Sequence, residues 1–127
     1  MAKKILIIDD DVDFVEMNKA VLTKEGFEVK EAYNGTEGLE LVKSEKPDLV
    51  ILDVMMSRAD EGFEVAREIR KDPKTRNLPI IMLTSVNQQP DYNWKFGPDE
   101  EWNPVDEFLE KPVSHDKLLQ KVNDLLA

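Results

Sequence analysis

Short apolar runs alternate with stretches of helical pattern along this chain of 127 residues. The runs cover residues 3–8, 27–32, 48–52, 78–83 and 107–109, and four of the intervals between them can hold a helix. Such alternation is typical of a parallel sheet with helices on both faces. We therefore expect an α/β fold with a doubly wound, five-stranded parallel sheet. The length predicts a single domain over residues 1–127.

The first interval predicts a helix over residues 12–24, which Gly26 would end. Three- and four-residue spacing assigns its buried face to Val12, Val15, Met17, Ala20, Val21 and Leu22. The other three expected helices follow the cap Asn34, cover residues 62–71, and cover residues 117–126 after the cap Ser114. Their expected buried residues are Leu39, Leu41 and Val42; Phe63, Val65, Ala66 and Ile69; and Leu118, Leu119, Val122, Leu125 and Leu126.

The composition narrows the possible partners and ligands. A net charge of -10 argues against binding to nucleic acid, because the phosphates would be repelled. The chain lacks cysteine, which excludes thiolate metal sites and leaves carboxylate oxygen as the expected ligand type. No segment resembles a signal peptide or a membrane span, so we expect a cytoplasmic protein that does not bind membranes.

Two of the apolar runs end in aspartate. The first run is followed by Asp9, Asp10 and Asp11, and the third is followed by Asp53. If both runs are neighbouring parallel strands, these carboxylates meet at one edge of the sheet, and a cation must offset their repulsion. The pattern therefore predicts a magnesium, manganese or calcium site, with Asp53 placed to attack or hold a phosphoryl group.

The same edge would receive side chains from two further strands. Thr84 and Ser85 follow the fourth apolar run, and Lys111 follows the last. A hydroxyl can donate to a phosphoryl oxygen and an ammonium can neutralise another, so the set suits a phosphorylated aspartate. Taken singly, each residue also has a structural explanation. The acids could cap the first helix, with Asp11 the best candidate, and Asp53 could bond to loop amides.

Four strings in this order resemble the receiver domain of two-component response regulators, the CheY-like superfamily. They are KILIIDDD at residues 4–11, PDLVILDVMM at 47–56, PIIMLTS at 79–85 and DEFLEKPV at 106–113. The resemblance covers essentially the whole chain. It implies the flavodoxin-like strand order 2-1-3-4-5 and phosphoryl transfer from a histidine kinase or phosphotransfer protein, with Mg²⁺ as the cofactor and Mn²⁺ as its substitute.

The resemblance also implies a role for each matching residue. Asp53 matches the phosphoacceptor, Asp10 the direct magnesium ligand, and Asp9 the acid that acts through a bound water. The backbone carbonyl of Met55 would complete the metal shell. Thr84 and Lys111 match the residues that contact the phosphoryl group, and Phe108 matches the aromatic switch residue. Together they predict a phosphorylation-dependent change in a surface that an unknown downstream protein recognises.

The chain departs from the family pattern in two places. Ser57 stands where the family commonly has proline, and residues 58–62 form a longer turn. Residues 87–104, where the family has its fourth helix, are broken by prolines and rich in aromatic residues, so we expect an atypical, degraded helix there. Trp94, Phe96 and Trp102 could cover the edge of the sheet or could form a partner-binding patch.

Two other functions are compatible with the sequence. A phosphorylation-independent adaptor would keep the fold as a docking surface. An aspartyl-phosphate hydrolase resembling the haloacid dehalogenase family would need an acid at position 55, where this chain has Met55. We therefore expect no enzyme activity beyond self-phosphorylation and self-dephosphorylation. Met55 and Val86 cannot orient an attacking water well, which predicts slow self-dephosphorylation, and His115 is expected to be an ordinary surface residue.

Overall fold

The structure is a computed structural model that describes residues 2–53, 61–85, 106–111 and 113–126, without the side chains of Glu61 and Ser85. Its strands are β1 (Lys4–Ile8), β2 (Glu28–Ala32), β3 (Leu49–Asp53), β4 (Ile80–Ser85) and β5 (Glu107–Lys111). Its helices are α1 (Val12–Lys24), α2 (Gly35–Glu45), α3 (Glu61–Lys71) and α4 (His115–Leu126). The expectations for residues 87–104 lie outside the described residues.

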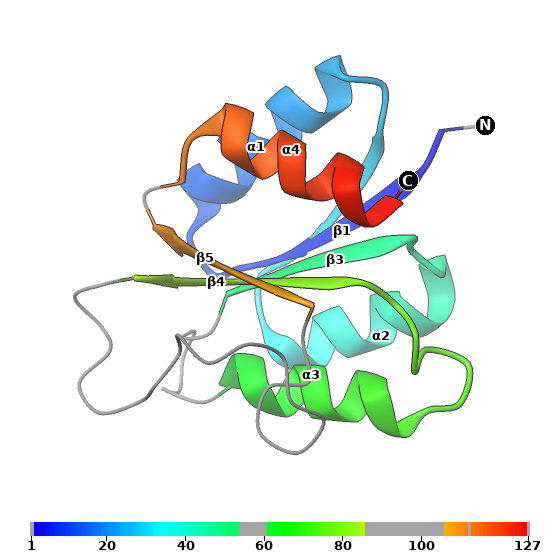
Figure 1. The fold of residues 1–127 in the computed structure, drawn as a ribbon. Helices are drawn as coiled ribbons and strands as arrows, with labels where there is room; N and C mark the ends of the chain where they lie inside the picture. The colour runs from blue at the N-terminus through cyan, green and yellow to red at the C-terminus, as the bar shows by residue number, and fades with distance from the viewer. Residues whose placement is uncertain (1, 54–60, 86–105, 112, 127) are drawn as a thin grey trace.

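The five strands form one parallel sheet in the order β2-β1-β3-β4-β5, which confirms the predicted fold class. All strands point the same way, so their carboxyl ends share one edge, on the left in Figure 1. In open sheets of this kind, ligands bind at that edge. Within the described ranges, no helix is both long enough and apolar enough to cross a membrane.

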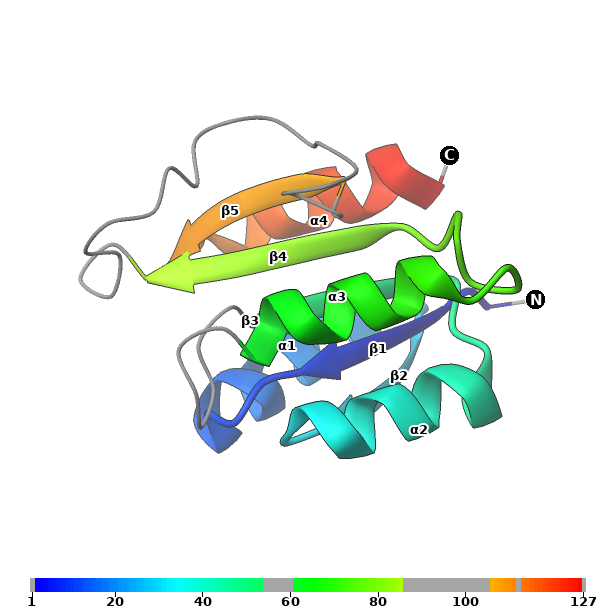
Figure 2. The same cartoon turned by 90° about the horizontal axis from the view of Figure 1, so that it is seen from below.

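The helices cover both faces of the sheet, with α1 and α4 on one face and α2 and α3 on the other (Figures 1 and 2). Successive strand residues point to opposite faces. In β1, for example, Leu6 and Ile8 belong to the core cluster that includes α3 residues, whereas Ile5 and Ile7 belong to the cluster that includes α1 and α4 residues. The near-continuous apolar strands are therefore explained by burial on both sides.

The predicted buried faces are confirmed for α2, α3 and α4 but not for α1. Val12, Met17 and Ala20 were expected in the core, yet all three are exposed, Val12 and Met17 by 54% and 51%. The buried residues of α1 are Val15, Asn18 and Leu22, which follow a three- and four-residue spacing with a polar residue in the middle. The side-chain nitrogen of Asn18 donates to the Phe14 carbonyl at 2.8 Å, which satisfies one of its two polar groups.

The predicted helix caps are confirmed. Asp11 accepts a hydrogen bond from the Phe14 amide at 3.1 Å, and Asn34 accepts one from the Glu37 amide at 2.8 Å. Ser114 caps α4 through the Lys117 amide at 3.1 Å. Gly26 follows α1 with a φ of 98°, a conformation that glycine adopts without steric cost.

Three strands continue further toward the carboxyl edge than their apolar runs. Asp53 is the last residue of β3, and β4 and β5 pair as far as Ser85 opposite Lys111. Backbone hydrogen bonding continues beyond the hydrophobic pattern because a neighbouring strand is still present to receive it. Asp53, Thr84, Phe108 and Lys111 therefore lie on strands, which fixes their backbone positions, whereas Asp9 and Asp10 directly follow β1.

An ion pair fixes the start of β5. Arg70 in α3 donates to the Asp106 carboxylate at 2.9 Å and to the Leu78 carbonyl at 2.6 Å. The same carboxylate accepts the Ile80 amide at 2.8 Å. Asp106 thus joins α3, β4 and β5 immediately before the strand that carries Phe108 and Lys111.

Replacing Gly38 with alanine is expected to destabilise the protein by about 1–2 kcal/mol, because overpacking outweighs the gain in helix propensity. A Cβ at this position in α2 would lie 2.5 Å from Cδ1 of Ile8 and 2.9 Å from its Cγ1. Urea unfolding measures the change. Ser44→Ala, at an exposed site in α2, reports the propensity effect alone. Adding Ile8→Val should recover part of the loss, and no recovery would contradict this explanation.

Candidate functional site

The side-chain alternation of the strands places several predicted site residues on one face. Asp53 follows Leu49 and Ile51, which face α1 and α4, and Lys111 follows Leu109 on that same face. Asp9 comes directly after Ile8, which pairs with Leu52 in the neighbouring strand. Three strands thus bring Asp9, Asp53 and Lys111 together at the carboxyl edge.

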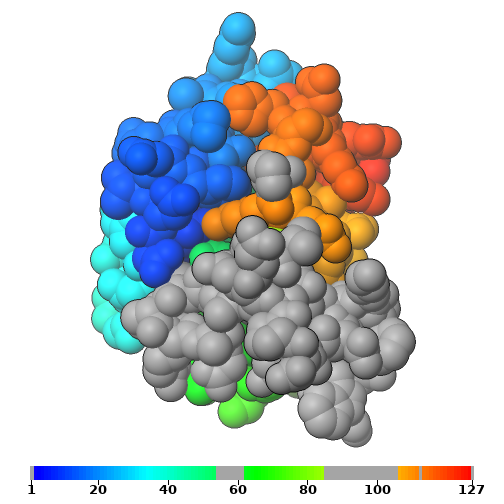
Figure 3. Space-filling view, turned by 90° about the vertical axis from the view of Figure 1, so that its left-hand side faces the viewer, coloured from blue at the N-terminus to red at the C-terminus, as the bar shows by residue number. Residues whose placement is uncertain are grey.

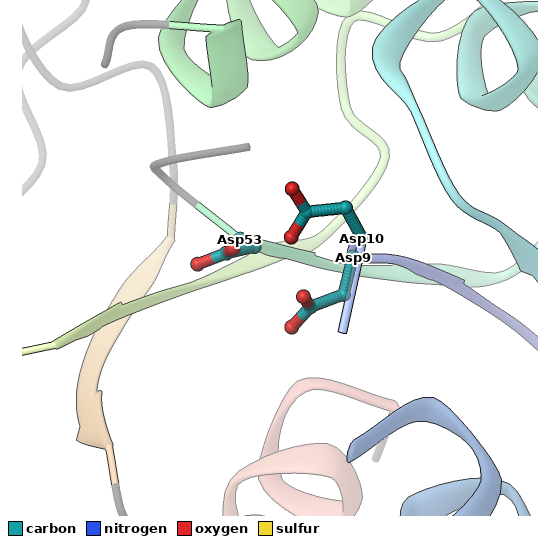
Figure 4. A group of neighbouring side chains, drawn as sticks. All are labelled: Asp9, Asp10 and Asp53. Atoms are coloured by element: carbon teal, nitrogen blue, oxygen red, sulfur yellow. The ribbon is translucent and has the colours of Figure 1, made fainter. Parts of the chain in front are cut away.

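Three carboxylates gather at this edge, from the end of β1 and from the end of β3 (Figure 4). One oxygen from each of Asp9, Asp10 and Asp53 lies within 4.8 Å of the others. Asp9 and Asp53 are only 1% and 5% exposed, whereas Asp10 is exposed. The predicted convergence of these acids is therefore observed, and two of the three are withdrawn from water.

The Lys111 ammonium lies between the two buried acids. Its Nζ donates to Asp9 Oδ2 at 2.8 Å and lies 3.7 Å from Asp53 Oδ1. The second oxygen of Asp9 accepts the Asp11 backbone amide at 2.9 Å. Lys111 offsets only part of the charge that three ionised acids would carry, so a divalent cation would stabilise the ionised form of the site.

Burial raises the pKa of Asp53 to about 7, and repulsion from Asp9 contributes in the same direction, while Lys111 opposes both. The pKa of Asp10 is also raised, first by desolvation and then by Asp9. Both shifts have the causes that the sequence predicted, namely like charges crowded at a partly buried edge. A bound divalent cation would relieve this repulsion.

The donor set fits Mg²⁺. This cation prefers hard oxygen ligands and is commonly held by one or two carboxylates. Asp9, Asp10 and Asp53 supply such oxygens within one small group. The predicted carbonyl ligand, from Met55, lies outside the described residues.

Thr84 and Phe108 lie toward the other face of the sheet. Thr84 is 2% exposed and continues the alternation of Ile80 and Met82 in β4. Phe108 is partly buried against the same core cluster, with its ring centroid 6.3 Å from that of Phe63 in α3. The two candidate switch residues therefore lie on the sheet face that α2 and α3 cover, while Asp53 and Lys111 lie on the face that α1 and α4 cover.

One site contact was not predicted from the sequence. Lys111 Nζ lies 4.3 Å from the centroid of the Phe14 ring, the geometry of a cation–π interaction. Phe14 is the third residue of α1 and is partly buried. Figure 3 looks onto this edge, where the blue surface of the N-terminal part meets the orange surface of the C-terminal part. The sequence did contain a sign of this contact. The first helix starts directly after the acid run, so its first turn, which carries Phe14, must lie near the site.

Some predicted features lie outside the described residues. They are Met55, Ser57, Val86, and the aromatic residues Trp94, Phe96 and Trp102. His115 is the first residue of α4 and is exposed.

Comparison with known proteins identifies the family. Residues 5–123 match the family model of the response regulator receiver domain. This chain belongs to that family. The receiver is 35% identical to protein PilH of Pseudomonas aeruginosa over 124 residues, which cover 98% of each chain. As a receiver, it is a signalling domain.

Solved structures agree with the assignment. A response regulator receiver domain protein from Clostridium thermocellum matches with a TM-score of 0.81 and 30% identity, over 98% of this chain and 94% of that one. The chemotaxis protein CheY4 of Vibrio cholerae matches with a TM-score of 0.82 and 26% identity, over 99% and 100% of the two chains. The resemblance stated from the four sequence strings is therefore confirmed, together with the strand order that it implied.

Proposed function

We propose that this receiver accepts a phosphoryl group on Asp53 from the phosphohistidine of a histidine kinase or a phosphotransfer protein. The reaction depends on Mg²⁺, and its product is an aspartyl phosphate that changes the surface seen by a downstream protein. The observation that carries the proposal is the placement of the Lys111 ammonium against the two buried carboxylates, 2.8 Å from Asp9 and 3.7 Å from Asp53. Asp10 completes the acidic group.

The proposed transfer uses each residue in a distinct way. An Asp53 oxygen forms a bond to phosphorus, and the bond from phosphorus to the donor histidine nitrogen breaks. Lys111 holds an ammonium where a phosphoryl oxygen would arrive, so it stabilises the added charge. Mg²⁺, held by Asp9, Asp10, Asp53 and the Met55 carbonyl, would neutralise the phosphoryl oxygens. Asp53 reacts as the carboxylate, and a cation favours that form.

The proposed switch involves Thr84 and Phe108. A phosphoryl group on Asp53 would offer a new hydrogen-bond acceptor to Thr84 on the adjacent strand. Thr84 lies toward the other face of the sheet, so its side chain would have to turn toward Asp53 to donate. Phe108 lies on β5, the strand beside the one that carries Thr84, and it packs against Phe63 in α3. We therefore expect a movement of Thr84 to displace the Phe108 ring. Phosphorylation then favours one of two arrangements of these side chains.

The proposal predicts that acetyl phosphate with Mg²⁺ adds one phosphoryl group to the protein, as intact-protein mass spectrometry would measure. Chelating the metal with EDTA should abolish the addition. Asp53→Asn should abolish it too, because the amide is not a competent nucleophile, and Asp124→Asn, at an exposed site in α4, should leave it unchanged.

Equal labelling of wild type and Asp53→Asn would contradict the assignment of the acceptor. A protein that takes up no phosphoryl group and binds no Mg²⁺ at millimolar concentration would instead support the adaptor function. Purified protein carrying phosphohistidine, incubated with the receiver, extends the test to the proposed physiological donor.

A further inference from the structure

The Phe14 ring contacts the same Lys111 ammonium that pairs with Asp9 and Asp53. We infer that Phe14 is a positioning residue for Lys111, and that its ring keeps the ammonium at the site where the phosphoryl group is received. The part of this inference that concerns phosphoryl transfer rests on the proposed function. The contact itself, with Nζ 4.3 Å from the ring centroid, is independent of that function.

Two hydrogen bonds link the backbone of Phe14 to Asp9 through Asp11. The Asp11 amide donates to Asp9 Oδ1 at 2.9 Å, and the Phe14 amide donates to Asp11 Oδ1 at 3.1 Å. Lys111 donates to the other oxygen of Asp9, Oδ2, at 2.8 Å. The cap of α1 thus sets the position of the Phe14 ring relative to Asp9, and Lys111 contacts both of these residues.

A hydrogen bond to the Phe14 carbonyl also fixes the helix turn that carries the ring. The Phe14 carbonyl accepts the side-chain amide of Asn18 at 2.8 Å. Asn18 is 2% exposed, so this bond is largely shielded on the Asn18 side. The backbone at Phe14 is therefore held on its amide side by Asp11 and on its carbonyl side by Asn18.

Lys111 needs such support because of its position and length. It is the last residue of β5, which lies at the edge of the sheet, and a lysine side chain there can readily turn into solvent. Its side chain is nevertheless only 19% exposed. When a cation or a phosphoryl group alters the charge on the acids, the attraction that Asp9 and Asp53 exert on Lys111 changes. The ring attracts the ammonium in either case, because its quadrupole does not depend on the state of the acids.

The contact can be tested by NMR without any phosphoryl transfer. Ring currents should shift the ε-methylene protons of Lys111 upfield of those of an exposed lysine such as Lys43. Phe14→Leu should abolish this shift, and Phe14→Tyr should retain it. An unshifted Lys111 resonance in the wild type would overturn the inference.

The role in the reaction can be tested with acetyl phosphate and Mg²⁺. Phe14→Leu is expected to slow phosphorylation of Asp53 by about threefold to tenfold, the range that a partly desolvated cation–π contact supports. Phe14→Tyr should restore the wild-type rate. Trifluorophenylalanine at position 14 keeps the shape of the ring and weakens its quadrupole, so it should slow the reaction without loss of fold.

Two controls separate positioning from packing. Phe27→Leu truncates another partly buried phenylalanine of the same core cluster and should leave the rate unchanged. In a Lys111→Met background, Phe14→Leu should cause no further slowing. An undiminished effect in that background would overturn the inference, as would a normal rate in Phe14→Leu. If the wild type accepts no phosphoryl group, the proposed function fails and with it the catalytic role, while the NMR result still decides the contact.

Discussion

Replacing Asp53 with asparagine is expected to stabilise the metal-free protein, by a margin that grows as the pH rises toward 7. The pKa of Asp53 is raised from 3.8 to about 7 in the folded state. Between these values the folded protein binds more protons at this carboxyl group than the unfolded chain does. Its contribution to stability therefore falls as the pH rises through this window, and it stays at its lowest value above it.

The expected effect is large for a domain of this size. One pKa unit corresponds to about 1.4 kcal/mol, so the full penalty approaches roughly 4 kcal/mol. Typical domains are stable by only about 5–15 kcal/mol in total. Asparagine keeps the shape of the side chain and carries no charge, so the penalty is absent in the variant.

Urea unfolding from pH 4 to pH 8, in the presence of EDTA, measures this difference. Asp124→Asn is the matched control, since it removes one exposed negative charge from α4. When EDTA is replaced by saturating Mg²⁺, the wild type should be stabilised more than Asp53→Asn, so the difference between their free energies of unfolding should become smaller. A difference between the two proteins that stays constant across this pH range would show that the Asp53 carboxylate carries no such penalty.

Replacing Lys111 with methionine is expected to destabilise the metal-free protein by about 2–3 kcal/mol at neutral pH. Removing one partner of a buried ion pair leaves the other charge uncompensated, which commonly costs about 3–5 kcal/mol. The lower figure applies because the Lys111 side chain retains 19% exposure. The largest part of the cost comes from Asp9, which is 1% exposed and would lose its ion pair with Lys111.

The comparison with Asp53→Asn isolates the electrostatic part of this effect. In the double variant, Lys111→Met should cost less than it does alone, because one of the two acids that it compensates is already neutral. Lys43→Met, at an exposed site in α2, controls for the loss of a surface lysine. Equal stabilities of Lys111→Met and the wild type would indicate that the ion pairs contribute nothing.

The fold could be predicted from the sequence because periodicity and strand ends carry most of the information. Apolar runs that are buried on both faces leave little alternative to a parallel sheet, and parallel strands necessarily bring their carboxyl ends together. Asp9, Asp10, Asp53 and Lys111 each follow such a run, so their convergence at one edge could be predicted. The strand order came from the family resemblance, since periodicity does not determine which strands are neighbours.

The buried face of α1 could not be predicted in the same way. Apolar spacing assigned Val12 and Met17 to the core, yet the structure buries Asn18 instead. Burial of an asparagine depends on a local hydrogen bond to the backbone, which hydrophobicity does not reveal. The contact between Phe14 and Lys111 could not be predicted either. It joins residues far apart in sequence, and it depends on how closely α1 packs against the sheet.

The most direct test of the account is chemical identification of the residue that carries the phosphoryl group. After incubation with acetyl phosphate and Mg²⁺, borohydride reduction converts an aspartyl phosphate into homoserine, which peptide mass spectrometry can locate. We predict homoserine at position 53 and at no other aspartate. Homoserine at position 9 or 10, or a phosphoryl group on a residue other than aspartate, would contradict the central claim.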